Sequence, residues 1–226
     1  MQHVTNRDTA FTFPSHSLLN LPPVHTVVVR VWLPDRPGAL GQVASRIGSV
    51  KGDVLGIDIL EAGGGRVIDE LVVALPDSAV VDLMVNEVHA IDGVSVEHVR
   101  PTVDEHTDGG QLALALAAEL AETDAAGRTD TLVNAVARLT EGAWALLCRD
   151  DTTVAAAGEP PSTDYVSALI AGRQHLGDHR ASDLFWSPLP LAGMWVAAGR
   201  PDRPVHDRER ARLDLFTRIA DVLLAS

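Results

Sequence analysis

The sequence predicts an α+β protein made of two successive units, and two observations support this prediction. Residues 25–101 show strand, helix, strand, strand, helix and strand periodicity in turn, whereas residues 111–226 show a different order of helices and strands. An acidic, polar stretch between them predicts a linker over residues 102–110. Residues 1–24 contain three prolines and no sustained periodicity, which predicts a flexible arm or leader.

Composition restricts the classes of function. The chain of 226 residues is 46% hydrophobic, enough for a sizeable core, and 31 acidic against 18 basic residues give a net charge of −13. Such a charge disfavours nucleic acids and anionic membrane surfaces as partners. The single cysteine, Cys148, excludes an internal disulfide, and no apolar run is long enough to span a bilayer. The start lacks a secretory signal, so we expect a cytoplasmic protein, and the near absence of lysine indicates a GC-rich bacterial genome.

The first unit has the pattern of a ferredoxin-like fold. Val27, Val29 and Val31 lie on one face of a predicted half-buried strand, with Arg30 and Trp32 on the other. The predicted elements are a strand (27–33), a helix (40–52), a strand (55–59), a glycine turn (63–65), a strand (67–73), a helix (80–88) and a strand (94–99). In a βαββαβ arrangement both helices cover one sheet face. The other face would remain bare, which predicts pairing with a partner.

The second unit is predicted as an α+β module with an antiparallel sheet. Its predicted elements are helices at 111–124 and 128–142, strands at 145–150 and 152–158, a helix at 163–172, strands at 183–191 and 193–199, and a closing helix at 206–225. The closing helix would bury a stripe formed by Leu213, Phe216, Ile219, Ala220 and Leu223. The run from Arg208 to Arg212 alternates in charge, which predicts a solvated helix face.

The stretch PDRPGALGQ, residues 34–42, is the richest candidate site. Asp35 can cap the following helix, Pro37 suits its first turn, and Gly38 lets other groups approach the backbone. The free amides of Gly38, Ala39 and Leu40 would then form an anion pocket at the positive end of the helix. The alternative is that these residues only start a helix. The stretch has neither the Gly-Lys-Ser/Thr of a P-loop nor a G-x-S-x-G elbow.

The strand, the turn and the βαββαβ order together resemble an ACT domain over residues 25–101. The resemblance rests on the D-x-P-G-x-L turn, here Asp35-Arg36-Pro37-Gly38-Ala39-Leu40, and on the glycine hairpin. It implies a regulatory module that binds an amino acid or related metabolite at the interface of two copies whose sheets lie side by side. It also implies that Asp35 binds the ligand's ammonium group and the helix amides its carboxylate. The implied ligand-binding residues are Asp35, Arg36, Pro37, Gly38, Ala39 and Leu40, together with Val54, Leu55 and Ile57 on the second strand of a neighbouring copy.

The second unit resembles a GAF domain. The likeness lies in LVNAVARLTEGAWALLCRDD, in GMWVAAGRPDRPVHDRERA and in the long final helix. The resemblance implies a domain for metabolite sensing, signal coupling or dimerisation. The sequence has no N-K-F-D-E nucleotide signature, and Cys148 lies in a predicted apolar strand, which is unsuited to holding a chromophore.

Other polar and aromatic residues do not form a recognisable site. His175 and His179 have metal-ligand spacing but no evident third ligand, so we expect no metal. Trp186 and Trp195, with Phe185, either line a pocket or belong to the core. No nucleophile, base and oxyanion stabiliser are recognisable as a set, so we expect no enzyme and no cofactor.

The sequence therefore predicts a cytoplasmic regulatory or sensor protein. Its expected partners are a small-molecule ligand such as an amino acid, a second copy bound through the ACT-like sheet, and an unidentified protein that receives the signal. Two alternatives stay open: a ligand-free dimerisation scaffold and an uncharacterised enzyme.

Overall fold

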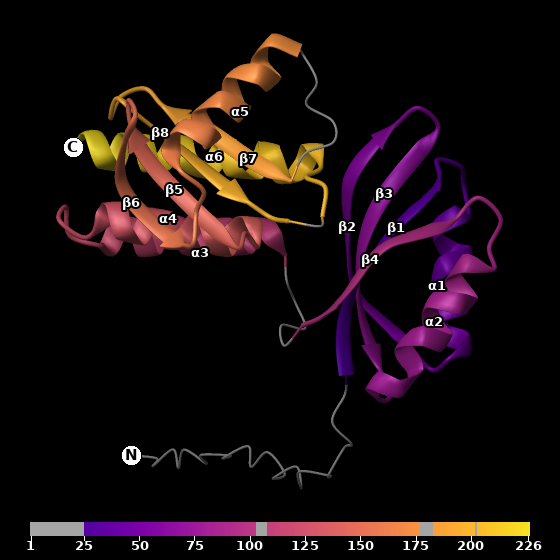
Figure 1. The fold of residues 1–226 in the computed structure, drawn as a ribbon. Coiled ribbons are helices and arrows are strands. Elements are labelled where there is room, and N and C mark those ends of the chain that lie inside the picture. Colours follow the sequence, from indigo (N-terminus) through magenta and orange to yellow (C-terminus); the bar gives the residue numbers. More distant parts are fainter. Residues whose placement is uncertain (1–24, 103–107, 177–182, 202) are drawn as a thin grey trace, which may run out of the picture.

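Two antiparallel four-stranded sheets and six α-helices form the structure (Figure 1). The computed structural model describes residues 25–102, 108–176, 183–201 and 203–226. The predicted arm over residues 1–24 and most of the predicted linker lie outside the described residues. Residues 25–102 are called the N-terminal half below, and residues 108–226 the C-terminal half.

The N-terminal half has the predicted ferredoxin-like order. Its elements are β1 (His25–Pro34), α1 (Ala39–Ser49), β2 (Asp53–Gly63), β3 (Arg66–Leu75), a 3-10 turn (Ser78–Val80), α2 (Val81–His89) and β4 (Ser95–Pro101). The strands run antiparallel in the order β2-β3-β1-β4. The crossovers place α1 and α2 on one face, where they bury the apolar sides of β1 and β3. The apolar residues recur every second position in strands and every third or fourth in helices, so each element presents one side to this core.

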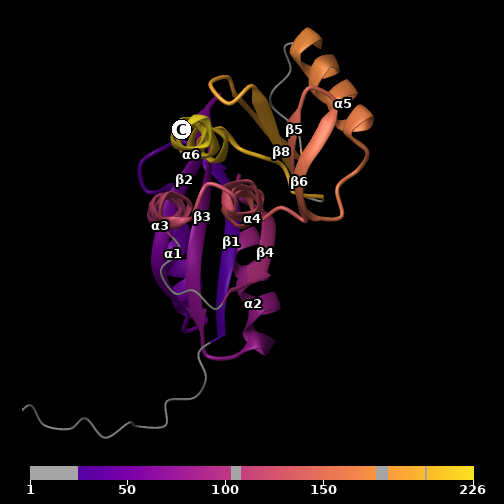
Figure 2. The same cartoon turned by 90° about the vertical axis from the view of Figure 1, so that its left-hand side faces the viewer.

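The C-terminal half is an α+β layer structure with its own core. Its elements are α3 (Gly109–Glu122), α4 (Arg128–Thr140), β5 (Trp144–Arg149), β6 (Thr152–Gly158), α5 (Thr163–Leu176), β7 (Leu184–Leu189), β8 (Met194–Gly199) and α6 (Asp207–Ala225). The sheet order is β6-β5-β8-β7, antiparallel throughout as predicted. Helices α3, α4 and α6 form the main core with one sheet face, and α5 packs against the other (Figure 2).

The second face of the N-terminal sheet is not bare. Thr26, Val28 and Arg30 point away from α1 and α2, yet each is buried, with Arg30 only 2% exposed. The C-terminal half covers this face, and the start of α6 lies against it (Figure 1). The prediction of a half-buried strand was therefore wrong, because β1 is buried on both sides within one chain. A partner is not needed to cover this face.

The buried stripe of α6 also differs in one position. Leu213, Phe216 and Ala220 are buried as predicted, but Ile219 is 45% exposed. At 3.6 residues per turn, Ile219 falls about 60° from Phe216 and 100° from Ala220 around the helix axis. The Ile219 side chain therefore lies at the exposed edge of the buried stripe, where it lines a groove between α3 and α6.

Candidate functional site

A type II β-turn links β1 to α1 and defines the candidate ligand site. The amide of Ala39 donates to the carbonyl of Arg36 at 3.2 Å, with Pro37 and Gly38 in the middle of the turn. Gly38 has φ 85° and ψ −7°, the left-handed geometry of the third turn position. Proline before glycine is the sequence that this turn prefers, which explains why PDRPG stands where a strand ends.

Asp35 does not cap α1, which corrects one prediction. The N-cap is Gly38, and no side chain bonds to the helix start. Because the turn places Asp35 three residues before the N-cap, its carboxylate cannot take the usual capping position. Its backbone amide instead donates to the carbonyl of Gly65 at 2.9 Å, which ties the loop to the β2–β3 hairpin. The exposed Asp35 carboxylate is left available to a ligand.

The set of free amides also differs from the prediction. Ala39 uses its amide inside the turn and buries its side chain in the core, so it anchors the loop and cannot bind an anion. Among the described residues, the amides of Gly38, Leu40 and Gly41 have no hydrogen-bond partner. Gly41 was missed because the predicted cap at Asp35 placed the helix start too early in the sequence.

The space above these amides is open. A Cβ atom at Gly38 would meet no heavy atom within 4 Å apart from its chain neighbours. Asp35, Arg36 and Pro37 are exposed around it, and Leu40 is partly buried. The first turn of α1 carries the positive end of the helix dipole, so the loop can hold a carboxylate while Asp35 faces an ammonium group.

Of the candidates on β2, Val54 lies at the other end of the sheet from the loop, and Ile57 lies near the middle of the sheet, opposite Leu71. Val54 pairs with Val73, next to Val27 at the start of β1, whereas the loop follows Pro34 at its end. Seven residues of strand separate these levels, about 23 Å. Leu55 and Ile57 are 36% and 50% exposed on the edge strand β2, and Val54 is partly buried. Within one chain the structure does not bring this trio to the loop; a neighbouring copy beside β2 would have to supply it.

A buried charge cluster joins the two halves, and local sequence reasoning missed it. Glu209 on α6 accepts from Arg30 of β1 at 2.7 Å and from Arg200 at 2.7 and 2.9 Å. Arg30 also donates to Glu70 of β3 at 2.6 Å. Glu209 is 9% exposed, so the predicted solvated face of residues 208–212 was wrong at this position. The charge of Arg30 in an otherwise apolar strand was the signal that could have indicated a buried partner.

Beside this cluster, His206 bridges two acids of the N-terminal half. Its Nδ1 lies 3.2 Å from Glu61 and its Nε2 lies 2.9 Å from Glu97, and the side chain is almost fully buried. Both ring nitrogens can donate only when the imidazole is protonated. Glu97 also accepts from the Trp32 indole at 2.9 Å, and Trp32 meets the His206 ring edge to face.

Neighbouring charges shift the pKa values in this cluster. Burial disfavours the charged form of His206, but the hydrogen bonds and charges of Glu97 and Glu61 outweigh it and raise the imidazole pKa. Burial opposes ionisation of Glu209 too, yet Arg200 and Arg30 lower its pKa to about 2. Glu209 is therefore ionised near neutral pH, and the acids around His206 favour its protonated form, so opposite charges face one another between the halves.

Arginine pairs at the rim extend the same contact. Arg212 donates to Asp58 of β2 at 2.7 Å, and Arg208 bonds to the Ile59 carbonyl and approaches Asp58 at 3.0 Å. Glu141 accepts from Arg203 of its own half and from Arg100 of β4. A ligand that displaced β1 or β2 would also disturb these ion pairs. A structural change in the N-terminal half could therefore affect the C-terminal half through them.

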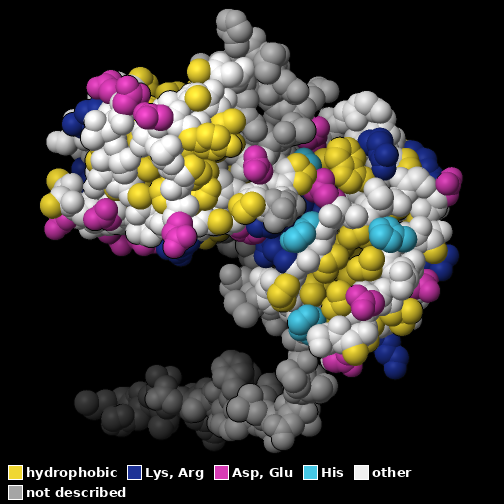
Figure 3. Space-filling model, viewed as in Figure 1, with side chains coloured by type: hydrophobic (Ala, Val, Ile, Leu, Met, Phe, Trp, Pro, Cys, Tyr) yellow, Lys and Arg dark blue, Asp and Glu magenta, His cyan; other side chains and the backbone are white. Residues whose placement is uncertain are grey.

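The remaining aromatic candidates are divided between two faces of the C-terminal sheet. Phe185 lies in the main core, whereas Trp186, Trp195 and buried Cys148 lie on the face under α5. Apolar side chains gather over this region in Figure 3. The Trp195 indole donates to the Asp150 carbonyl at 3.1 Å. His179 and the side chain of His175 lie outside the described residues.

Two further classes of site can be assessed only for the described part of the chain. There, no group of three His, Cys, Asp or Glu side chains converges as a metal site. Within the same residues, no helix has both the length and the apolar character needed to cross a bilayer.

Two solved structures are among those that this chain resembles. The first is the ACT domain of a GTP pyrophosphokinase from Chlorobium tepidum, at 17% identity and a TM-score of 0.29, covering 37% of this chain and 92% of that domain. This chain is similar to an ACT domain over that part. The second is an unknown protein from Galdieria sulphuraria, at 14% identity and a TM-score of 0.31, covering 78% of this chain and 81% of that one. No family model matches the chain, and no curated protein does. The GAF-like character of the C-terminal half stays a prediction.

Proposed function

We propose that the chain is a non-enzymatic regulatory protein that binds a small zwitterionic metabolite, of the amino acid class, in the loop between β1 and α1. The observation that carries the proposal is one loop that combines open space at Gly38, an exposed Asp35 carboxylate and the unpaired amides of Gly38, Leu40 and Gly41. The carboxylate and the amides have opposite polarity. The two ends of a free amino acid match this polarity.

The loop is the element best placed to report ligand binding to the rest of the chain. It continues β1, and β1 carries Arg30, whose guanidinium bonds to Glu209 of the other half. A ligand bound in the loop would shift the equilibrium between contacting and separated halves only if it bound one of these two states more tightly than the other. In this proposal the C-terminal half passes that change to a protein partner or to self-association.

Thermal denaturation against the twenty standard amino acids tests the proposal. A ligand present at 100 times its dissociation constant stabilises the folded state by about 2.7 kcal/mol. We expect one amino acid, or one chemical group of them, to raise the melting temperature selectively. If none changes it, the ligand-free scaffold becomes the better account.

A further inference from the structure

Helix α3 has apolar side chains on its core side and on part of its exposed side, which also carries Gln111, Glu119 and Glu122. Its inner side packs against α4 and α6 in the main core. Its outer side carries Leu114, which is 69% exposed, and the exposed residues Ala115 and Ala118. A helix at a protein surface normally turns polar residues to water, and one that is apolar on all sides is normally buried. The strip formed by Leu114, Ala115 and Ala118 is therefore apolar where a surface helix would normally carry polar residues.

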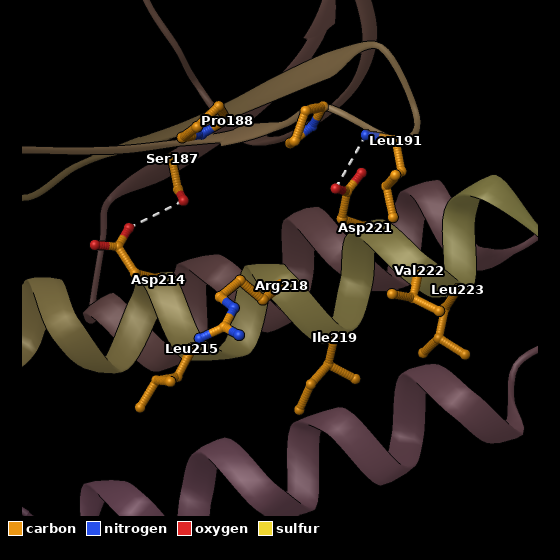
Figure 4. Close-up of a pocket in the computed structure, with 11 residues that line it drawn as sticks. Ser187, Pro188, Leu191, Asp214, Leu215, Arg218, Ile219, Asp221, Val222 and Leu223 are labelled. Atoms are coloured by element: carbon orange, nitrogen blue, oxygen red, sulfur yellow. Dashed lines mark hydrogen bonds between the residues drawn. The ribbon is translucent and has the colours of Figure 1, made fainter.

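Helix α6 continues this apolar surface. Leu215, Ile219 and Val222 are 59%, 45% and 57% exposed, and their spacing of four and three residues places them along one side of the helix. Figure 4 shows Leu215 and Ile219 projecting from α6 toward the neighbouring helix. These two residues and Leu114 line a groove of about 540 Å³ between α3 and α6, and a second groove of about 1050 Å³, lined by Val222 among others, lies between α6 and β7 with its following loop.

Six exposed apolar residues on these two helices are called the α3/α6 face below: Leu114, Ala115, Ala118, Leu215, Ile219 and Val222. Monomeric soluble proteins rarely expose an apolar patch that extends over two helices, and such patches mark interaction sites. Because the second face of the N-terminal sheet is already covered within the chain, the α3/α6 face is a large apolar surface that still lacks a cover.

We propose that the α3/α6 face binds the same face of a second copy of this chain, around a two-fold axis perpendicular to the helices. Charge complementarity favours a second copy as the occupant. Glu122 at the end of α3 and Arg218 on α6 are both exposed, and neither has an ion-pair partner among the described residues. One face thus carries an unpaired acid and an unpaired base. A two-fold interface pairs a surface with itself, so both charges can be satisfied at once.

The helix geometry places these charges in register. Leu114 lines the same groove as Leu215 and Ile219, so it lies at about the level of Arg218. Glu122 follows eight residues later, about 12 Å farther along the helix. A two-fold axis near Ala118 and Val222, midway between these levels, brings Glu122 against Arg218 of the partner subunit. The small side chain of Ala118 at the centre permits close helix approach.

Sedimentation equilibrium of the full chain tests the proposal. We expect a species of twice the chain mass of 24.0 kDa at micromolar concentration. Ile219→Glu should raise the dissociation constant at least a hundredfold, because it buries two unpaired carboxylates across the two-fold axis. Leu83→Glu is the matched control: Leu83 is 51% exposed on α2, away from the face, and its substitution should leave the dissociation constant unchanged.

Charge reversal identifies the occupant as a second copy. Glu122→Arg or Arg218→Glu alone should raise the dissociation constant about tenfold, since two symmetric pairs are lost, and the double variant should restore it. The proposal would be overturned if the wild-type chain stayed monomeric at about 100 micromolar. This outcome includes the case in which residues 1–24 cover the α3/α6 face within one chain. A dimer that survives Ile219→Glu with unchanged affinity, or a double variant without restored affinity, would also overturn it. Melting temperatures show that each variant is folded.

Discussion

The imidazole Nε2 of His206 lies 2.9 Å from a carboxylate oxygen of Glu97, and this contact joins two halves of the chain that each have a core of their own. The second ring nitrogen faces Glu61 at 3.2 Å. Because both contacts need a protonated ring, the docking of the halves is linked to pH.

We predict that the contribution of His206 to stability is lost at alkaline pH. The pKa of the folded-state imidazole is raised above the ordinary value of about 6.5, so its contribution is complete below that value and disappears as the pH rises through the folded-state pKa. Urea unfolding at pH 6 and pH 9 measures this. His206→Gln should be less stable than wild type at pH 6, and the gap should narrow at pH 9.

His25→Gln is the matched control, since His25 begins β1 and its side chain forms no hydrogen bond or ion pair with the described part of the other half. Its difference from wild type should not change between the two pH values. An equal gap at both pH values for His206→Gln would mean that the ring is neutral in the folded state.

Removal of the central carboxylate should destabilise the contact strongly. Glu209→Gln leaves Arg200 buried without a counter-charge and leaves Arg30 with only Glu70, which costs about 3–5 kcal/mol for a buried pair. Small-angle scattering should show a larger radius of gyration if the halves separate, and urea unfolding should show a lower midpoint if they unfold together. A variant with wild-type stability and size would show that the cluster does not hold the halves together. Glu119→Gln, which removes an exposed pair with Arg138, should change stability by at most about 1 kcal/mol.

The contribution of Glu209 to stability depends on pH in the opposite direction to that of His206. The pKa of Glu209 is lowered to about 2, so its stabilising effect is present above the ordinary carboxyl value and is lost as the pH falls from about 4.5 toward 2. We expect a steep decline in the free energy of unfolding below pH 4.5. In Glu209→Gln that decline should be shallower.

Alanine substitutions at two glycines should change the stability of the protein in opposite directions. A Cβ at Gly199 would lie 2.2 Å from the Trp144 ring, so Gly199→Ala should lower stability by about 1–3 kcal/mol through overpacking. Gly48 lies in α1 with open space around it, so Gly48→Ala should raise stability by about 0.5–1 kcal/mol. Calorimetric melting temperatures of the two variants check both signs.

The sequence predicted the elements well because their periodicity is local. The alternation of Val27, Val29 and Val31 and the glycine hairpin are sufficient to place β1, β2 and β3 in the N-terminal sheet. The contact between the halves was not predictable in the same way. Arg30 and Glu209 lie 179 positions apart, and no local rule connects a charge in a strand with one in a distant helix.

The position of the loop that forms the candidate site was predicted, but its hydrogen bonds were not. The PDRPG stretch indicated a loop at a helix start, and the structure has one there. Asp35 and Gly38 both fit an N-cap by residue type, and only the turn geometry decides between them. In this turn the Ala39 amide donates to the Arg36 carbonyl, and the Asp35 side chain does not bond to the start of the helix. The β2 trio came from resemblance, and the register places Val54 at the far end of the sheet and Ile57 near its middle.

Isothermal titration of the protein with the amino acid that raises its melting temperature tests the central proposal most directly. Gly38→Asn keeps a residue that tolerates the left-handed conformation but fills the space above the amides, and Gly64→Asn makes the same change at an open hairpin position with φ 61°. The account predicts binding to wild type and Gly64→Asn with equal affinity, and at least tenfold weaker binding to Gly38→Asn. Equal affinity of all three proteins would contradict it.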